Sequence, residues 1–460
     1  MKRKKVIAVI GAGISGLATA YLLYKKGFEV IVFEKNDVVG GSIETVFENG
    51  FLFDRGPNSA LETTPVIGYL VDELNLKEEL IYANKKGNKR YILKNNKLRP
   101  LPMSPQGFIK TKLFSTSAKL RLFAEPFIGR SKDGYYQSVA EFVTRRLGRE
   151  FLDYAINPFV AGVYAGKPEE LSVKSAFPKL YALEEKYGGL IIGTIRSIRE
   201  RRKRAEIAKQ SAKMISFKEG MQTLPLALSD ALSQNVVTSA QVASIDKNES
   251  GFIITYRLKG SFKTFECDAV LSTVPAFAAA ELFSKFDTGI KNHLEDIYYP
   301  PVLVYYLVYN KENIRQTLDG FGFLIPSKEN KSFLGAIWSS VIFPGRTEED
   351  KAAFTLFIGG SRNPEFVDEK REALLDRVRE EFEELMMING RPVYSAERYW
   401  DKAIPQYKLG YIEHENYFDT FEKNNPGLFL SGNYRGGISV GDCIKNAELV
   451  AKKISIKMNI

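Results

Sequence analysis

The sequence predicts an α/β fold in which one nucleotide-binding domain is assembled from segments far apart in the chain. Three observations predict it: a glycine turn between two apolar strand patterns near the N-terminus, an acidic residue directly after the second pattern, and a glycine-rich junction between a strand and a helix near the C-terminus. Alternation of strand, helix and strand is typical of an α/β fold with a parallel sheet. Because both ends of the chain carry such patterns, we expect a discontinuous, Rossmann-like domain.

The first element is a βαβ unit over residues 6–33. Residues 6–10 and 29–33 are apolar runs typical of buried strands, and residues 17–23 between them have helical character. The glycine turn that joins strand and helix would present backbone N–H groups at a helix N-terminus to a pyrophosphate. We therefore predict a dinucleotide site, to which the turn contributes Gly11, Ala12, Gly13, Ile14, Ser15 and Gly16.

Glu34 makes this prediction specific. It directly follows the second strand pattern, where a carboxylate accepts hydrogen bonds from the adenosine ribose hydroxyls. Glycines at this spacing occur by chance in many proteins, whereas the combination of both strands, the glycines and the acid is much rarer. We expect Glu34 and its neighbour Lys35 at the adenosine end of the site.

A second glycine turn indicates which dinucleotide binds. Gly40 and Gly41 follow Glu34 closely, and the chain continues to an RGPNS stretch at residues 55–59. Nicotinamide dehydrogenases have no need of such a turn, whereas flavoproteins of the amine oxidase and glutathione reductase types use one where the chain passes the FAD pyrophosphate. A plain hairpin turn is the alternative explanation. We predict an FAD site that includes Gly40, Gly41, Gly56, Pro57, Asn58 and Ser59.

The C-terminal part of the sequence supplies the other half of the site. Residues 427–433 form a short apolar strand pattern that ends in a glycine turn, and a glycine-rich stretch leads from residue 436 into a helix. Free N–H groups and a positive helix end suit the flavin edge that gains negative charge on reduction. We expect Val242, in a third segment at 235–245, against the adenine, and residues 265–275 as a further strand. The C-terminal stretch would contribute Gly432, Ile438, Ser439 and Val440.

The composition excludes several other classes of protein. The chain has 460 residues, enough for two or three domains. Cys267, Cys443, His293 and His414 are its only cysteines and histidines, so we expect no disulfide scaffold and no metal site. No second glycine motif follows a strand pattern, so we expect no nicotinamide cofactor. No apolar run is long enough to cross a bilayer, and we expect a cytoplasmic protein.

The net charge of +10 calls for a partner or another explanation. The basic excess lies at residues 2–5 and 196–213. No nucleic-acid-binding motif accompanies it, so we expect no nucleic acid partner. A solvated helix and attraction to an anionic membrane leaflet both remain open. The densest basic run consists of Arg199, Arg201, Arg202, Lys203 and Arg204.

Beyond the glycine patterns, eight stretches carry a resemblance to a known family. They are GAGISGLA at 11–18, RGPNS at 55–59, NKRYIL at 88–93, PFVAGVYAGKPEELS at 158–172, FKEGMQTLP at 217–225, GFGFLIPSKE at 320–329, AIPQY at 403–407 and GNYRGGISVGDCI at 432–444. In these stretches the chain resembles the oxygen-dependent protoporphyrinogen oxidases, FAD enzymes of haem synthesis within the amine oxidase superfamily. Coproporphyrinogen III oxidase, a close relative of that family, shares nearly all of them.

The resemblance implies a six-electron oxidation of protoporphyrinogen IX to protoporphyrin IX. In each of three rounds a hydride would pass from a bridge carbon to N5 of a non-covalently bound flavin, and O2 would reoxidise the flavin and yield H2O2. Cofactor chemistry of this kind leaves the protein to supply position and electrostatics. The pyrrole protons need no dedicated base, so we expect no catalytic side chain.

Several substrate and flavin contacts are carried over by the resemblance. Arg90 would pair with a ring propionate, for which a guanidinium is well suited. Leu324 and Ile337 would sandwich one pyrrole and Phe357 would stack on another, although without the family all three would be ordinary strand residues of a core. The residues that would line the flavin, or lie between the flavin and the substrate, are Asn58, Trp400 and Pro405.

Three alternative functions remain open. Coproporphyrinogen III differs from protoporphyrinogen IX in having two more propionates, and the stretches at 88–93 and 158–172 favour the plant-type protoporphyrinogen enzymes over it. An amine oxidase would share the fold, but the chain has AIPQY where amine oxidases have a PYSGG-like stretch, and no lysine in residues 300–309. A flavin-binding protein without turnover is the third, and H2O2 release on adding a porphyrinogen would distinguish it.

The resemblance also implies three domains: a GR2-type FAD-binding domain of residues 1–63, 217–277 and 415–460, an α+β substrate domain of 64–89 and 278–414, and a helical domain of 90–216. The helical domain mixes apolar and basic residues in a way that suits a bilayer interface, or these apolar residues fill its own core. Hand-over of the product to the next haem-pathway enzyme and a homodimer also remain open. The mixed residues are Phe108, Ile109, Leu113, Phe114, Leu122, Phe123, Phe127 and Ile128, with Lys110, Lys112, Lys119, Arg121 and Arg130.

Overall fold

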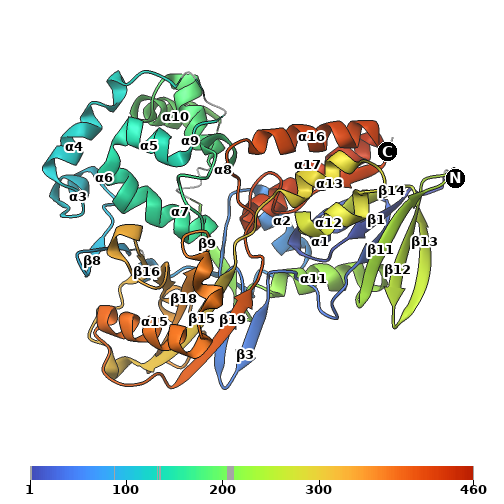
Figure 1. Ribbon diagram of the computed structural model, residues 1–460. Helices are drawn as coiled ribbons and strands as arrows, with labels where there is room; N and C mark the ends of the chain where they lie inside the picture. Colours follow the sequence, from blue (N-terminus) through green and yellow to red (C-terminus); the bar gives the residue numbers. More distant parts are fainter. Residues whose placement is uncertain (1–2, 88, 132, 134–135, 205–211, 459–460) are drawn as a thin grey trace.

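The computed structural model describes residues 3–87, 89–131, 133, 136–204 and 212–458. In Figure 1 these residues form a part with a parallel sheet and both termini on the right, a group of helices at the upper left, and a large sheet with helix α15 at the lower left. Asn88 of the NKRYIL stretch and residues 205–211 of the basic segment lie outside the described residues, as do the side chains at 201–204. No helix of the described part is long and apolar enough to cross a bilayer.

The parallel sheet confirms the predicted α/β fold and its discontinuity. Its strand order is β10-β2-β1-β14-β20, and every neighbouring pair is parallel. Helices α1 (Ile14–Lys25) and α17 (Val440–Lys457) pack into the same apolar core on one face of this sheet. The strands, which come from four distant segments, are β1 (Val6–Ile10), β2 (Glu29–Phe33), β10 (Val236–Val237), β14 (Ala269–Ser272) and β20 (Leu428–Leu430).

The strand predicted over residues 265–275 is in fact two strands in two different sheets. Its first half belongs to an antiparallel sheet of β11 (Ala240–Lys247), β12 (Phe252–Leu258) and β13 (Ser261–Cys267), and its second half is β14. Asp268 lies between them and accepts hydrogen bonds from Arg3 (3.0 Å), Lys5 (2.9 Å) and the backbone N–H of Val6 (2.8 Å). These bonds hold the chain where it changes sheets, which an apolar pattern alone does not reveal.

A seven-stranded sheet of order β19-β15-β18-β17-β16-β7-β8 forms the second part. One face is covered by α15 (Arg371–Met386), whose Phe382 packs with Phe323 and Phe354 of the sheet. Residues 89–98, whose sequence predicts a hairpin that turns at Asn95 and Asn96, form this hairpin, and both asparagines have positive φ between β7 and β8. The strands are β7 (Lys89–Lys94), β8 (Lys97–Pro100), β15 (Val302–Asn310), β16 (Gly320–Leu324), β17 (Gly335–Ile337), β18 (Lys351–Gly359) and β19 (Tyr394–Trp400).

The domain boundaries differ from the predicted ones in three places. Strands β7 and β8 fall in the range assigned to the helical domain, yet β7 pairs in parallel with β16, so the sheet continues to residue 100. Helix α2 (Pro65–Glu73) packs into the core beneath the parallel sheet instead of the substrate domain. Helices α12 (Ala276–Phe283) and α13 (Thr288–Glu295) pack with the antiparallel sheet and α16 (Tyr411–Asn424). Each difference comes from long-range packing.

The helical part consists mainly of short helices, and it buries some of the mixed apolar residues named above while it exposes others. Leu113 and Phe114 are 0% and 4% exposed, because Phe114 stacks on Phe151 at 4.3 Å. In contrast, Phe123 and Phe127 are 68% and 90% exposed. The elements are α3 (Pro105–Lys110), α4 (Thr116–Phe123), η2 (Glu125–Phe127), α5 (Val139–Leu147), α7 (Asn157–Tyr164), α9 (Pro178–Tyr187) and α10 (Leu190–Arg204).

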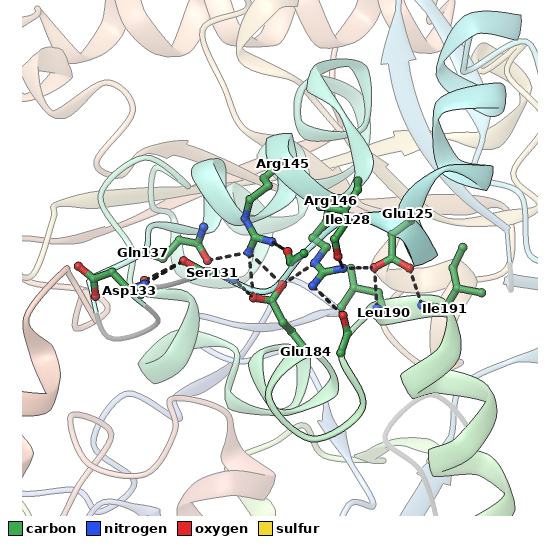
Figure 2. A network of polar contacts seen from close by, with 12 residues as sticks. Glu125, Ile128, Ser131, Asp133, Gln137, Arg145, Arg146, Glu184, Leu190 and Ile191 are labelled. Atoms are coloured by element: carbon green, nitrogen blue, oxygen red, sulfur yellow. Dashed lines mark hydrogen bonds and ion pairs between the residues drawn. The ribbon is translucent and has the colours of Figure 1, made fainter.

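A fully buried ion-pair network ties these helices together (Figure 2). Arg146 of α5 donates to the Glu125 carboxylate at 3.1 Å, to the Gly188 carbonyl at 2.8 Å and, through Nε, to the Glu184 carboxylate. The Glu125 carboxylate in turn accepts from the N–H groups of Leu190 (2.7 Å) and Ile191, the first residues of α10. A carboxylate at a helix N-terminus is stabilised by the helix dipole. The network therefore joins η2, α5, α9 and α10 through charges that have no access to solvent.

Candidate active site

The predicted glycine turn forms a cradle at the N-terminus of α1. Gly11 has a φ of +100°, and a Cβ added to Gly16 would lie 2.0 Å from the Gly11 carbonyl oxygen and 2.6 Å from Thr273 Oγ1. Gly13 is the N-cap of α1 and makes no side-chain cap hydrogen bond. The first N–H groups of the helix therefore have no side-chain acceptor at the cap, which is the arrangement that binds a phosphate.

Glu34 lies beside this cradle and is only 5% exposed. Its carboxylate accepts hydrogen bonds from the backbone N–H groups of Ala12 (2.8 Å) and Asn36 (3.0 Å). Each carboxylate oxygen keeps a further lone pair, so two ribose hydroxyls can still donate to it. The N–H of Ala240 donates to the Glu34 carbonyl at 2.7 Å, which brings the start of β11, and with it Val242, next to the acid. Lys35 is exposed.

The second glycine turn packs directly on the first. The N–H of Gly40 donates to the Ala12 carbonyl at 2.9 Å, and a Cβ added to Gly41 would lie 3.3 Å from the Gly13 Cα. A Cβ added to Gly56 would lie 1.8 Å from the Ser42 carbonyl oxygen, so the RGPNS stretch follows the same turn. A plain hairpin turn has no need of these close backbone approaches. The geometry thus fits FAD, whose pyrophosphate and ribityl chain pass both turns.

The C-terminal glycine stretch is held near the cradle by a tyrosine of the AIPQY stretch. The Tyr407 hydroxyl donates to the Asn433 carbonyl at 2.8 Å and accepts from the N–H of Gly437 at 3.0 Å. Ser439 caps α17, accepting from the N–H of Asp442 at 3.1 Å. Gly432, with a φ of +134°, directly precedes Asn433. Ile438, next to Ser439, is half-buried, and Val440 is buried at the start of the helix.

Two hydrogen bonds fix residues 54–59 against the seven-stranded sheet. The Trp400 indole N–H donates to the Arg55 carbonyl at 2.8 Å, and the Tyr306 hydroxyl donates to the Asp54 carbonyl at 2.6 Å. Burial raises the pKa of Tyr306 well above its ordinary value, so its hydroxyl stays a neutral donor. Glu44 pairs with the guanidinium of Arg55 at 2.7 Å. The flavin-side segment is therefore held directly against the substrate-side sheet. Pro405, which follows Trp400 closely in the chain, is buried.

The strand register places the predicted substrate residues on one face of the seven-stranded sheet. Leu324, Gly335 and Phe357 lie opposite one another across β16, β17 and β18, and Gly322, Ile337 and Thr355 do the same two residues away. Residues opposite one another share a face, and so do residues two apart on one strand. Arg90 pairs with Gly322 across β7 and β16. This face, opposite to α15, is called the ligand face below.

The ligand face is not fully covered by the rest of the protein. Leu324, Ile337 and Phe357 are each half-buried, whereas Phe323, Ala336 and Leu356 on the other face of the same strands are at most 3% exposed. Helix α7 covers part of it, since a Cβ added to Gly162 would lie 2.6 Å from Leu324 Cδ2. Tyr306 and Thr355 on the same face are buried, so the open part is the apolar surface around these three half-buried residues, which can bind a flat apolar ligand.

A small pocket joins the ligand face to the flavin-side segment. It is lined by Asn58 and Ser59 on one side and by Ile337, Thr355 and Phe321 on the other. The Arg90 guanidinium carbon lies 5.6 Å from the centre of the Phe321 ring, within range of a cation–π interaction. The structure therefore brings together Asn58, Ile337 and Arg90, which are far apart in the sequence.

Several residues that build this site were not predicted. Tyr306 and Thr355 lie on the ligand face, Tyr407 ties the C-terminal glycines, and Arg346 lies 3.7 Å from the buried Asp54 carboxylate. Burial raises the pKa of Asp54 and lowers that of Arg346. For these residues the sequence holds one signal, Asp54 at the end of the apolar FLFD stretch. A charge at the end of a buried strand requires a partner, which here is Arg346.

Comparisons with known proteins agree with this geometry. The family model described as flavin containing amine oxidoreductase matches residues 14–455. Protoporphyrinogen oxidase 2 of Arabidopsis thaliana is 36% identical over 97% of this chain and 94% of its own length. Coproporphyrinogen III oxidase of Bacillus subtilis is 28% identical over 96% of both chains. A crystal structure from Exiguobacterium sp., provisionally named a protoporphyrinogen oxidase, superposes with a TM-score of 0.80 at 20% identity and covers 99% of both chains.

The nucleotide cradle, the second glycine turn and the sheet beside them therefore define a flavoprotein of the flavin containing amine oxidoreductase class, with FAD as its cofactor. Within that class the chain belongs to the protoporphyrinogen oxidase family, because relatives of that name match almost its whole length at 33–36% identity.

Proposed function

We propose that this protein oxidises protoporphyrinogen IX to protoporphyrin IX in haem biosynthesis, using FAD and O2 and releasing H2O2. The observation that carries the proposal is the open apolar ligand face, which ends at Arg90 and adjoins the flavin-side residues 54–59. A large, flat, apolar macrocycle with a carboxylate edge needs both features. The similarity to protoporphyrinogen oxidases of Arabidopsis thaliana and Nicotiana tabacum supports the same substrate.

The chain's own residues position the substrate and exclude water. Leu324, Ile337 and Phe357 contact the pyrrole rings through apolar surface, and the Arg90 guanidinium pairs with a propionate. Asn58, on the flavin side of the pocket, keeps the macrocycle and the cofactor in contact. FAD supplies the two-electron oxidation when bound and O2 accepts the electrons, so six electrons require three rounds. No side chain is assigned as an acid or base.

FAD is bound without a covalent link in this proposal. The two cysteines, Cys267 and Cys443, are both buried. Burial raises the pKa of Cys267 to about 12 and that of Cys443 to about 11, so neither forms the thiolate that attacks a flavin ring.

The substrate is tested by supplying both porphyrinogens to the purified enzyme under air. We expect H2O2 release with each oxidation, and a higher kcat/KM for protoporphyrinogen IX than for coproporphyrinogen III, because the ligand face is apolar away from Arg90. Coproporphyrinogen III is the alternative substrate, supported by the similarity to the Bacillus subtilis enzyme. A higher kcat/KM for it would reverse the assignment, and no H2O2 with either would leave a flavoprotein of other function.

We also propose that the helical part attaches to the cytoplasmic face of an anionic membrane. Ile109 on α3, Leu120 and Phe123 on α4, and Phe127 on η2 are all more than 60% exposed. The chain from residue 85 to 124 contains eleven lysines and arginines and no aspartate or glutamate. Exposed apolar side chains among cations favour an interface between water and anionic lipid. Attachment there would let the enzyme take up a poorly soluble substrate and pass the product to the next enzyme of the pathway.

Flotation with liposomes tests this attachment. We expect the protein to float with liposomes rich in anionic lipid at low salt and to be released at high salt, because screening weakens attraction to the surface charge. The double variant Phe123→Ser/Phe127→Ser should stay at the bottom of the gradient. Phe47→Ser is the matched control, since Phe47 is 72% exposed but lies on β3 (Thr45–Glu48), outside the helical part. Wild-type protein that stays at the bottom at both salt concentrations contradicts the proposal.

A homodimer remains a prediction.

A further inference from the structure

A second arginine lies on the ligand face beside Arg90. The register pairs Ile92 with Arg99 across β7 and β8, and Leu324 with Ile92 across β16 and β7. Because paired residues share a face and side chains alternate along a strand, Arg90, Ile92 and Arg99 all lie on the ligand face. Arg99 is the diagonal neighbour of Arg90 on the next strand, at a Cα separation of about 7–8 Å. Two arginines on neighbouring strands therefore share one edge of the face.

Neither guanidinium is neutralised by an acidic residue in the part of the chain that the structure describes. Among the described residues, neither side chain makes a hydrogen bond or an ion pair: the exposed Arg90 lies over the Phe321 ring, and Arg99 is half-buried. Neighbouring cations on the same hairpin do have acidic partners: Lys89 pairs with Asp319, and Lys94 pairs with Glu150 at 2.9 Å. A partly desolvated cation without a counter-charge is costly. An anionic ligand at this edge would offset that cost.

The surroundings of the two arginines attract anions. The acid-free stretch of residues 85–124 contains both of them, and β8 leads directly into α3 of the basic helical surface. On the other side, beyond Ile92, which is buried against the helical part, lie the apolar Leu324 and Phe357 of the ligand face. The face thus has a cationic edge toward the helical part and an apolar middle.

We infer that Arg99 binds a second carboxylate of the substrate, beside the one that Arg90 binds. The inference rests on the proposed function, and it orients the macrocycle. Protoporphyrinogen IX carries its two propionates on adjacent pyrroles, so one carboxylate meets each guanidinium, with the bidentate geometry that arginine provides. The propionate edge then faces β7 and β8, and the vinyl-bearing rings lie over the apolar middle of the ligand face.

Substrates with and without free carboxylates test the inference. Arg99→Met should raise KM for protoporphyrinogen IX by about tenfold or more, with kcat within about twofold and the flavin content unchanged. Arg90→Met should behave in the same way. With the dimethyl ester of protoporphyrinogen IX, which has no free carboxylate, wild type and Arg99→Met should have the same KM. The matched control is Lys89→Met, which removes one charge from the other face of β7 and should leave both KM values unchanged.

Equilibrium binding of the product separates this inference from the proposed function. Protoporphyrin IX and its dimethyl ester bind without turnover, and Arg99→Met should weaken binding of the free acid only. An unchanged KM and Kd for the free acid, or an equal loss with the ester, overturns the role of Arg99. Wild-type enzyme that oxidises neither porphyrinogen contradicts the proposed function, and the binding measurement then decides on Arg99 by itself.

Discussion

Replacing Gly16 by alanine is expected to abolish FAD binding. The new Cβ would lie 2.0 Å from the Gly11 carbonyl oxygen, which is backbone and cannot rotate away, and 2.6 Å from Thr273 Oγ1. To relieve this clash, α1 must move away from β1, and this movement takes the N–H groups of the cradle out of position. The purified variant should therefore have almost no flavin absorbance, whereas wild type should have close to one flavin per chain.

Gly68→Ala is the matched control for this substitution. Gly68 lies in α2, which packs into the same core, and an added Cβ there meets nothing within 4 Å. Alanine favours a helix over glycine by about 1 kcal/mol, so this variant should keep its flavin and unfold at the same or a slightly higher temperature. A Gly16→Ala protein that purifies with full flavin would show that the cradle does not hold the cofactor.

Replacing Arg146 by alanine is expected to destabilise the helical part by about 3–5 kcal/mol. Arg146 and Glu125 have no exposed side-chain surface, and Glu184 has almost none. Removing the cation leaves the Glu125 carboxylate without its counter-charge, leaves Glu184 with Arg145 as its remaining cation, and leaves the Ile128 and Gly188 carbonyls without this donor. The variant should show a lower Tm by calorimetry, and limited proteolysis should cut the helical part first.

Arg149→Ala gives the comparison for this prediction. Arg149 also pairs with a carboxylate, Asp153 at 3.0 Å, but its side chain is 66% exposed. Exposed ion pairs contribute about 0–1 kcal/mol, so its Tm should stay close to that of the wild type. Equal Tm values for Arg146→Ala and wild type would mean that water or another cation replaces the guanidinium in the network.

The sequence predicted those parts of the fold that depend on local patterns. The βαβ unit, the glycine turns and the Asn95–Asn96 hairpin each follow from a few consecutive residues whose backbone angles or apolar periodicity are specific. The parallel pairing of β7 with β16 was not predicted, because its partners are more than two hundred residues apart. The burial of Leu113 and Phe114 depends on Phe151 in the same way, and helical periodicity alone does not distinguish a core face from a lipid-facing one.

The candidate site was predictable where a motif fixes it and not where packing builds it. The residues around Gly11, Glu34 and Gly40 come together in the structure as expected. Arg90 and Ile337 were assigned only through the family resemblance, since on their own they are ordinary strand residues. Arg99 has no signal in the sequence at all: only the register of β8 shows that it shares a face with Arg90.

The five-stranded parallel sheet has a consequence for how this protein is made. Its central strand pairs, β1 with β14 and β14 with β20, join the first residues of the chain to residues near 270 and 430. Such pairings must wait for the later strand to leave the ribosome, and non-local sheets form slowly. One edge of β14 therefore stays unpaired from the time β14 leaves the ribosome until β20 follows, and the glycine cradle cannot close around FAD until β20 and α17 have been added. Maturation of the holoenzyme therefore waits for these late segments, and FAD that binds once they are in place stabilises the native fold.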